Sequence, residues 1–589
     1  MFFYLHYRIQ RGALPVTVRV LESPELHHPE EQVLYVGPGV QRLETIFLPD
    51  GSQLLLLGDP VGELQTPNSK LQTSNFKLQT LLETVRGHYY WFWVQGPSIR
   101  CGASFGAIFP LYHQLENDQV QISSSAFFLA GQTDPGAPDR RYLLERLLFN
   151  YAFFNRTWWT RIRLLPAHHG LRLHPSGIEV EKVLSVADYF GTGWRDKRSD
   201  LDELAAVFEA ESRLFLPDAP FAVSFTGGFD GRTLVAAARA AGRRDFFTYS
   251  FGMPDESDLR FPAEQSRRLG IDYLPVCLDA GYVERHAGES ARGFLHETDF
   301  FGNLGRPHYR YAARVLAEKT GYLLTGNFGS ELFRAMHQPG VMMSAALIQI
   351  FAAPDDTWKD ALRRAAGPQA AFFRNEIEDL IADLERYLAD SPDTDPNRRF
   401  YRFVLEEIFR KYFGPELVMQ ARYLRNRTPY LSLPFFQKLN ETRWAGVHAR
   451  LFEKQKNKRL KGQQFYAAFL RRTDRQLYRL PTNKGYRPAD VLDSWRLPLL
   501  LAGVARQKFF RQETGDSNAV EAFFSRYCRE WDGYAQLAAD PVWQNSGLAR
   551  TLEDSPAGAL EQNIQLHTLA AGWLAAQNLV YHDLITSNR

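Results

Sequence analysis

The chain has 589 residues, which is too long for one hydrophobic core, so about two to four domains are expected. Hydrophobic residues make up 45% of the chain and charged residues 23%, as in ordinary soluble globular proteins. The 69 basic residues nearly balance the 67 acidic ones, and the resulting net charge of +2 gives no electrostatic reason to expect a nucleic-acid partner.

The cysteines and the apolar runs limit the cellular setting. Cys101, Cys277 and Cys528 have no metal-ligand spacing, and their odd number argues against a disulfide framework. The N-terminus has no basic segment followed by a long apolar run, as a signal peptide would have. No apolar run is long enough to cross a membrane. We therefore expect a cytoplasmic protein without a membrane partner.

The first 190 residues have the character of β-strands. Short apolar or alternating runs are bounded by Gly, Pro and Asp, as in "QVLYVG", "SQLLLLG", "YYWFWVQG" and "GLRLHPSGIEVEKV", the last with a hairpin turn at "HPSG". The stretch 61–82 repeats "KLQT" at Lys70 and Lys77, and we expect it to be a loop.

The pattern changes after a boundary near 190–200. Helical spacing at 201–216 is followed by alternating strand-like and helix-like segments, beginning with "FAVSF" and "RTLVAAARAAG". This alternation predicts a parallel sheet with helices on its faces. From about 345 the chain is mainly helical, as in "EIEDLIADLERYLAD". We therefore expect domains at 1–195 and 196–345, and a helical part with a C-terminal extension at 346–589.

The stretch "SFTGGFDGR" lies between a predicted strand and a predicted helix. Ligands of open parallel sheets bind at the carboxyl ends of the strands, where backbone N–H groups of a glycine turn and a helix N-terminus attract anions. Thr226 supplies a hydroxyl, and Gly227 and Gly228 allow close approach. A carboxylate beside phosphates, as at Asp230, makes sense mainly through a bridging Mg²⁺. The residues alone leave a second interpretation open, a tight turn with Asp230 stabilised by the helix dipole.

The surrounding motifs carry a family resemblance. The stretch resembles the pyrophosphate loop S-G-G-x-D-S-[ST] of the N-type ATP pyrophosphatases, and the order of the later segments resembles the synthetase half of the asparagine synthetase family. The segments that carry this resemblance are 246–279, "LLTGNFGSELF" at 323–333, "RYLRNRTPYLSLPFF" at 422–436 and "LYRLPTNKGYRP" at 477–488. "GAIFPLYHQ" and "IRLLPAHHGLRLHPSG" resemble the amino-terminal glutaminase domain, so the similarity covers roughly residues 85–490.

The resemblance implies an α/β protein: a degenerate Ntn-type β-sandwich, a HUP-like ATP pyrophosphatase domain and a large helical part. It also implies ATP and Mg²⁺, with Asp230 as a magnesium ligand. The residues that it assigns to nucleotide or pyrophosphate are Ser224, Thr226, Gly227, Gly228, Asp230, Gly231, Arg232, Ser250 and Gly326. It assigns catalytic roles to Glu331 and Lys484.

Several positions depart from the family pattern. Residue 2 is Phe2, where the glutaminase needs a cysteine, so we expect no glutaminase activity. Gly231 replaces a serine, and we hypothesise that Arg232 offsets that loss by giving charge to a phosphate. Ser330 replaces a second magnesium aspartate.

Two further departures affect the second and the last segments. Asn327 and Phe328 replace an Asp-Gly pair in the second segment. In the last segment Asn483 aligns with the family's lysine, and Lys484 follows one residue later. A lysine there would stabilise charge as the acyl-adenylate forms or is attacked.

These features predict an ATP-dependent amide-forming ligase that acts through an acyl-adenylate. Its partners would be a small-molecule or peptide carboxylate and an amine, as in the related β-lactam synthetases and lasso-peptide cyclases, and the family resemblance allows a homodimer. The first alternative is a catalytically impaired relative that binds a nucleotide or a partner protein, and the second is a tRNA-modifying ATP pyrophosphatase. For the adjacent His168 and His169 we predict structural roles, because neighbouring residues of a strand face opposite sides.

Overall fold

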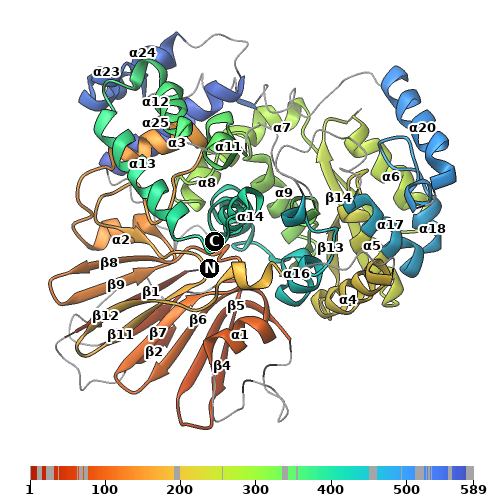
Figure 1. Cartoon of the computed structure of the whole chain (residues 1–589), viewed down its shortest axis with the longest axis horizontal. Coiled ribbons are helices and arrows are strands. Elements are labelled where there is room, and N and C mark those ends of the chain that lie inside the picture. Colours follow the sequence, from red (N-terminus) through yellow and green to blue (C-terminus); the bar gives the residue numbers. More distant parts are fainter. Residues whose placement is uncertain are drawn as a thin grey trace.

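The fold is described from a computed structural model of the chain (Figure 1). The structure describes residues 2–9, 16–20, 32–37, 39–62, 64, 71, 77–191, 199–254, 256–333, 342–352, 356–449, 461–492, 494–510, 523–524, 527, 531, 533–554 and 560–578.

The N-terminal part contains two six-stranded sheets. The first has the order β10 (Arg163–Leu164), β8 (Tyr112–Glu116), β9 (Gln119–Ser123), β1 (Phe3–Arg8), β3 (Val33–Val36), β2 (Thr17–Val20). The second has the order β12 (Gly177–Lys182), β11 (His169–His174), β7 (Ser98–Ala103), β6 (Arg86–Gln95), β5 (Gln53–Val61), β4 (Arg42–Phe47). The Phe3 ring of the first sheet lies 4.7 Å from the Tyr90 ring and 5.0 Å from the Phe92 ring of the second. The two sheets therefore pack face to face, which confirms the predicted mainly-β N-terminal part.

The strand sequences explain this packing. Residues 88–94 of β6 are all buried, and the strand accordingly has a continuous apolar run where a half-exposed strand would alternate. The "HPSG" turn joins β11 to β12 as a hairpin in which His174 pairs with Gly177. In the stretch expected to be a loop, the second "KLQT" copy instead begins the short helix α1 (Leu78–Thr84), which buries Leu78 and Leu81. Of the first copy, only Leu71 lies within the described residues, and its side chain is buried.

A five-stranded sheet follows, and every strand pair in it is parallel. Its order is β15 (Tyr273–Cys277), β14 (Phe246–Gly252), β13 (Phe221–Ser224), β16 (Tyr322–Leu324), β17 (Arg425–Arg427). The helices of this part include α4 (Ser199–Phe215), α5 (Asp230–Ala240), α6 (Ser257–Leu269), α8 (Ala287–Glu297), α9 (His308–Ala317) and α10 (Gly329–Phe333). The predicted alternation of strands and helices is confirmed.

Helices cover both faces of the parallel sheet. Ala222 and Leu323 pack in one apolar cluster with residues of α8 and α9. Val223 and Leu324, the next residues along the same strands, belong to the larger core that includes residues of α4 and α5. Successive side chains of a strand face opposite sides, so both faces of β13 and β16 are buried and the sheet is doubly wound.

The rest of the described chain is helical, as predicted. It includes α11 (Ala345–Ala352), α12 (Thr357–Ala365), α13 (Arg374–Ala389), α14 (Pro396–Phe403), the π-helix η3 (Val404–Phe413), α15 (Gly414–Gln420), α16 (Leu433–Asn440), α17 (Lys461–Thr473), α18 (Arg475–Arg479), α20 (Leu497–Phe510), α22 (Tyr534–Ala539), α23 (Pro541–Ser546), α24 (Leu548–Glu553) and α25 (Leu560–Asn578). Among the described residues, no helix combines the length and the apolar character that a membrane crossing requires.

The C-terminal helix returns to the N-terminal part of the chain (Figure 1). Gln565 of α25 donates hydrogen bonds of 2.7 Å to the carbonyls of Arg146 and Leu147 in α3 (Arg140–Phe149). The Trp159 indole N–H donates to the Ala576 carbonyl at 3.1 Å. The expected C-terminal extension thus packs directly on the N-terminal part. The domain boundaries at 195 and 345 stay predictions, and the first of them lies outside the described residues.

An ion pair joins the second β-sheet to the parallel sheet. Arg427 of β17 donates to both carboxylate oxygens of Asp59 in β5, at 2.6 and 3.1 Å, and both residues are buried. A bidentate pair of this kind fixes the relative orientation of its two planar groups. It therefore holds the edge strand β17 against the N-terminal part.

Candidate functional site

The candidate site lies at the point where the strand order of the parallel sheet reverses. Chain order runs outward from β13 through β14 to β15 on one side, and from β16 to β17 on the other. In doubly wound sheets, ligands bind outside the carboxyl ends of the strands at this point. The glycine loop at 225–229 follows β13, and the loop at 325–328 follows β16. Two segments that the sequence predicted separately therefore meet at one place.

The glycine loop ends at the N-terminus of α5. This helix has eleven residues. Its N-cap residue is Phe229, whose side chain accepts no hydrogen bond from the first backbone N–H groups. Such N–H groups, together with the helix dipole, attract anions. Thr226 is exposed and Gly228 half-buried, so the loop is accessible from solvent.

Gly231 permits a close approach between the start of α5 and the end of β13. A Cβ atom on Gly231 would lie 2.2 Å from the carbonyl oxygen of Ser224, which is closer than such atoms approach. The family's serine at this position therefore has no room here. The missing hydroxyl is a consequence of how the strand and the helix pack in this chain.

Asp230 is held by hydroxyl groups from three other segments. The Ser330 hydroxyl donates to Oδ2 of Asp230 at 2.9 Å, and the Tyr466 hydroxyl donates to Oδ1. The Tyr430 hydroxyl donates to the Asp230 carbonyl at 3.3 Å. The pKa of Tyr466 is well above its usual value, first because of burial and then because of the Asp230 charge, so the phenol remains a donor. Asp230 is thus half-buried and oriented by its partners.

Glycines in the second loop make room for Asp230. A Cβ atom on Gly326 would lie 2.6 Å from the Asp230 Cβ atom, and one on Gly329 would lie 2.8 Å from Oδ1. Only a residue without a side chain fits at these two positions without displacing the carboxylate. The predicted site residue Gly326 therefore lies directly against Asp230.

The backbone of the second loop is unusual at Phe328. Its φ angle is 68°, in the left-handed region that glycine favours, and the family has glycine here. The buried Phe328 ring packs against the rings of Phe409 and Phe413, at centroid distances of 4.7 and 5.2 Å. Packing on the π-helix η3 therefore offsets the strain at this residue.

Glu331 lies in α10, which follows the second loop. Its backbone carbonyl accepts a hydrogen bond of 3.3 Å from the Tyr401 hydroxyl, and the residue is half-buried. The Glu331 charge contributes to the raised pKa of Tyr466, as the Asp230 charge does. Both carboxylates thus act electrostatically on the same phenol.

The segment that contains Lys484 packs on the glycine loop. The Asn483 N–H donates to the Gly227 carbonyl at 3.1 Å. A Cβ atom on Gly227 would lie 2.3 Å from the Asn483 Cβ atom, so the absent side chain of Gly227 is what allows this contact. Thr482 closes the turn with two hydrogen bonds of 2.8 Å to the Tyr486 carbonyl. Lys484 itself is exposed at this turn, beside the glycine loop.

Arg232 has contacts that differ from the phosphate contact hypothesised for it. The residue is fully buried, and its guanidinium donates to the carbonyls of Leu477, Leu480 and Pro481 at 3.1, 3.2 and 2.7 Å. Burial lowers the pKa of Arg232 to about 10, and the nearby Asp474 charge opposes that change. The side chain holds the segment that leads to Lys484.

The two serines at strand ends have separate surroundings. Ser250 is buried, and its hydroxyl donates to the Asp258 carbonyl at 2.6 Å and lies 2.8 Å from the Tyr273 hydroxyl. Ser224 is half-buried at the end of β13, where it hydrogen-bonds the Tyr249 hydroxyl. The Ser250 hydroxyl therefore joins β14 to α6 and β15.

Sequence reasoning missed two members of the site. Tyr430 lies in a segment whose sequence signals only the family resemblance, and Tyr466 belongs to no motif. Tyr466 lies within the apolar run "FYAAFL" of α17, and nothing in its spacing distinguishes it from a core residue. The described residues hold no group of three or more His, Cys, Asp or Glu side chains arranged for a metal ion. His168 is buried and accepts the Gly106 N–H at 3.1 Å, which is the structural role predicted for it.

No family model and no curated protein matches the chain. Among solved structures, the chain is similar to the glutamine phosphoribosylpyrophosphate amidotransferase from B. subtilis complexed with ADP and GMP. The two are 11% identical, with a TM-score of 0.16, and the match covers 51% of this chain and 66% of that enzyme. A likeness this weak carries no argument about function, and the family membership expected from the motifs remains a proposal.

Proposed function

We propose that the protein is an ATP-dependent ligase that activates a carboxylate as an acyl-adenylate, releases pyrophosphate and forms an amide with an amine. One observation supports this proposal most strongly. The segment with Gly326 and Glu331 and the turn with Lys484 both contact the glycine-loop segment that ends at Asp230, although the three segments are distant in the sequence. The order of the motifs in the sequence predicts the same grouping.

The glycine loop would bind the phosphates of ATP. Backbone N–H groups of residues 227–231 and the α5 N-terminus supply the positive potential, and Thr226 adds a hydroxyl donor. Nucleotide atoms beyond the phosphates would lie along the end of β14, near Ser250. Because the Ser250 hydroxyl already has partners, we expect its backbone, with that of neighbouring residues, to make this contact.

The donor set at Asp230 fits Mg²⁺. Magnesium is usually held by one or two carboxylates together with phosphates and water. Asp230 offers one carboxylate, Ser330 lies within hydrogen-bond distance of it, and Glu331 is the nearby second acid. When bound there, Mg²⁺ would neutralise phosphate charge. The Tyr466 and Ser330 hydroxyls would keep Asp230 oriented toward it.

Lys484 would stabilise negative charge at the reacting carboxyl and phosphate groups. Arg232 is assigned a positioning role, because its three carbonyl contacts fix the segment that precedes the lysine turn. With Phe2 in place of a nucleophile, the amine would come from the substrate or from free ammonia.

The alternative is a protein that binds nucleotide without turnover. One observation favours it: both oxygens of Asp230 already accept hydroxyl hydrogen bonds, which a metal would have to compete with or displace. The same alternative is favoured by the absence of the serine, the aspartate and the lysine that the family pattern has at Gly231, Ser330 and Asn483.

Pyrophosphate exchange into ATP separates the two proposals. The ligase predicts magnesium-dependent exchange that needs a particular carboxylic acid and is abolished in Asp230→Asn. The variant Asp379→Asn, an exposed residue on α13, is the matched control and should exchange as the wild type does. Binding of ATP without exchange across a broad panel of amino acids, peptides and small carboxylic acids would favour the alternative.

A further inference from the structure

A cavity lies where the N-terminal sheets meet the helical part of the chain. Its volume is about 70 Å³. Phe2, Ile108 and Tyr112 line it from the N-terminal part, and Asp299, Arg410 and Val418 line it from the later elements. None of the residues assigned to the nucleotide site lines it.

Two buried arginines line this cavity and form no ion pair among the described residues, although the Glu407 charge acts on Arg410 from farther away. Arg146 is 3% exposed and donates only to the Phe300 and Gly302 carbonyls and the Tyr142 hydroxyl. Arg410 is 6% exposed and donates through Nη2 to the Leu165 carbonyl at 2.8 Å. Its Nη1 has no hydrogen-bond partner in the described part of the chain. A buried guanidinium that forms no ion pair is costly.

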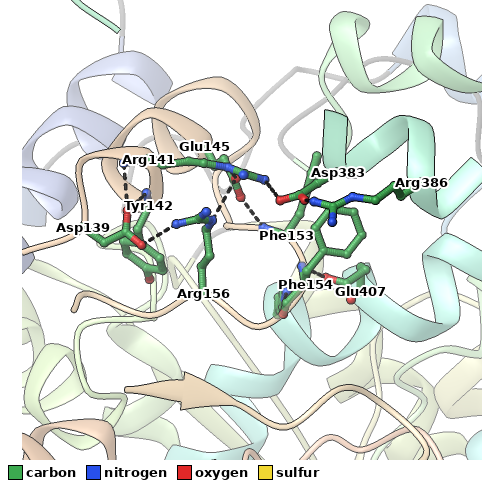
Figure 2. A network of polar contacts seen from close by, with 11 residues as sticks. Asp139, Arg141, Tyr142, Glu145, Phe153, Phe154, Arg156, Asp383, Arg386 and Glu407 are labelled. Atoms are coloured by element: carbon green, nitrogen blue, oxygen red, sulfur yellow. Dashed lines mark hydrogen bonds and ion pairs between the residues drawn. The ribbon is translucent and has the colours of Figure 1, made fainter. Parts of the chain in front are cut away.

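Unlike Arg146 and Arg410, the neighbouring cationic side chains form ion pairs. Figure 2 shows Arg156 between Asp139 and Glu145, and Arg141 between Glu145 and Asp383, each within ion-pair distance. Lys411, which follows Arg410 directly, pairs with Glu407. The nearby carboxylates are therefore already committed to other cations.

The acidic side chains of the cavity wall also have ion-pair or hydrogen-bond partners. Glu297 pairs with Arg310 at 2.8 Å. Asp299 accepts the Ser125 hydroxyl at 2.9 Å and the Ala126 N–H at 2.6 Å. The Asp299 charge acts on Arg422, which also lines the cavity, so Arg146 and Arg410 remain without an ion pair and give the cavity an excess of positive charge.

The walls around that charge are mostly apolar and aromatic. They include Phe2, Ile108, Leu164, Phe301 and Val418. A guanidinium donates well to a planar carboxylate, and apolar walls favour a ligand with an apolar body over inorganic phosphate. The small volume limits that body to a short aliphatic chain, because a benzene ring needs a cavity of about 150 Å³.

We propose that this cavity is a second ligand site, which binds a small apolar carboxylate with its charge compensated by Arg410 and Arg146. The site is independent of the proposed ligase activity, because it shares no residue with the glycine loop. It is built from both parts of the chain, so the ligand would also stabilise their contact.

Calorimetric titration of the full chain with propionate, in the absence of ATP, tests the proposal. Propionamide is the uncharged matched ligand. We expect one propionate per chain, a higher melting temperature in its presence, and binding of propionamide weaker by at least about tenfold because the charge-assisted hydrogen bonds are lost. Equal binding of the two compounds, binding of inorganic phosphate alone, or no binding of propionate would overturn the proposal.

The variant Arg410→Met is a second test. It should weaken propionate binding by at least about tenfold. Without ligand it should melt at the same temperature as the wild type or higher, because a buried charge that forms no ion pair is replaced by an apolar chain. Arg386→Met changes an exposed arginine that pairs with Asp383 in the neighbouring polar network (Figure 2), and this control should bind propionate normally. If Arg410→Met does not fold, Val418→Phe fills the cavity while keeping both arginines, and unchanged propionate binding in that variant would contradict the proposal.

Discussion

The Ser330 hydroxyl donates a 2.9 Å hydrogen bond to the Asp230 carboxylate, although the two residues lie 100 positions apart. This contact joins α10, which follows the loop after β16, to the first turn of α5. It places Ser330 beside the carboxylate that we propose as the magnesium ligand.

The first prediction concerns Gly227, whose missing side chain leaves room for Asn483. Gly227→Ala would bring a Cβ atom to 2.3 Å from the Asn483 Cβ atom, so we expect a loss of about 1–3 kcal/mol in the free energy of unfolding. Urea denaturation measures this. Gly321→Ala, at a position with open space around it, should be neutral. The double variant Gly227→Ala/Asn483→Gly should recover part of the loss, and failure to recover would show that the two segments do not pack as described.

The second prediction concerns Arg232 as the support of the 477–481 segment. Arg232→Met leaves three backbone carbonyls without their donor, and should lower the free energy of unfolding by about 3 kcal/mol or more in the absence of nucleotide. Arg363→Met, at an exposed ion pair, should change stability by less than about 1 kcal/mol. If Arg232→Met kept wild-type stability and lost only ATP affinity, the arginine would contact phosphate instead.

The third prediction tests the left-handed backbone at Phe328. Phe328→Ala and Phe328→Gly both lose the packing on Phe409 and Phe413, but only glycine relieves the strain at a φ of 68°. We expect the glycine variant to be the more stable of the two by about 1 kcal/mol, the reverse of the ordinary order. At Phe469, inside α17, alanine should be the more stable by a similar amount. Thermal or urea unfolding of the four variants measures these stabilities. If alanine were the more stable substitution at both positions, the backbone of Phe328 would not be strained.

The sequence anticipated the location of the site better than its contacts. Alternating segments at 201–278 predicted a parallel sheet, and in such a sheet the loops after β13 and β16 must emerge at one edge. The partner of Asp230 in α17 could not be foreseen, because Tyr466 is 236 positions away and resembles a core residue. The phosphate contact hypothesised for Arg232 rested on charge alone, and only packing reveals that its guanidinium meets carbonyls. Phe328 in place of glycine did carry a signal, since a glycine position in a turn often has positive φ.

The fourth prediction is a pH dependence that originates at Asp299. Burial raises the pKa of Asp299 to about 6, against the opposing effects of its hydrogen bonds and of Arg422. The folded state therefore binds this proton more tightly than the unfolded state, and its contribution to stability is lost as the pH rises from about 4 through 6. The expected change is on the order of 3 kcal/mol.

Asp299→Asn tests this assignment. The variant should be less stable overall, because an amide NH₂ would face the Ala126 N–H, but its stability should depend less on pH between about 4 and 7. Urea denaturation of both proteins across this pH range measures the difference. If the free energy of unfolding of the variant changed with pH as steeply as that of the wild type, the effect would come from other buried acids. Glu145 and Glu416 are such acids, because burial also raises their pKa values.

The fifth prediction, and the most direct test of the central claim, is equilibrium binding of ATP with and without Mg²⁺. Titration calorimetry would compare the wild type with Asp230→Asn and with the exposed control Asp379→Asn. We expect magnesium-dependent binding in the wild type, a loss of affinity of at least about tenfold in Asp230→Asn, and no change in the control. Binding by the wild type that does not depend on magnesium, or wild-type affinity in Asp230→Asn, would contradict the assignment of this loop to a magnesium–ATP site.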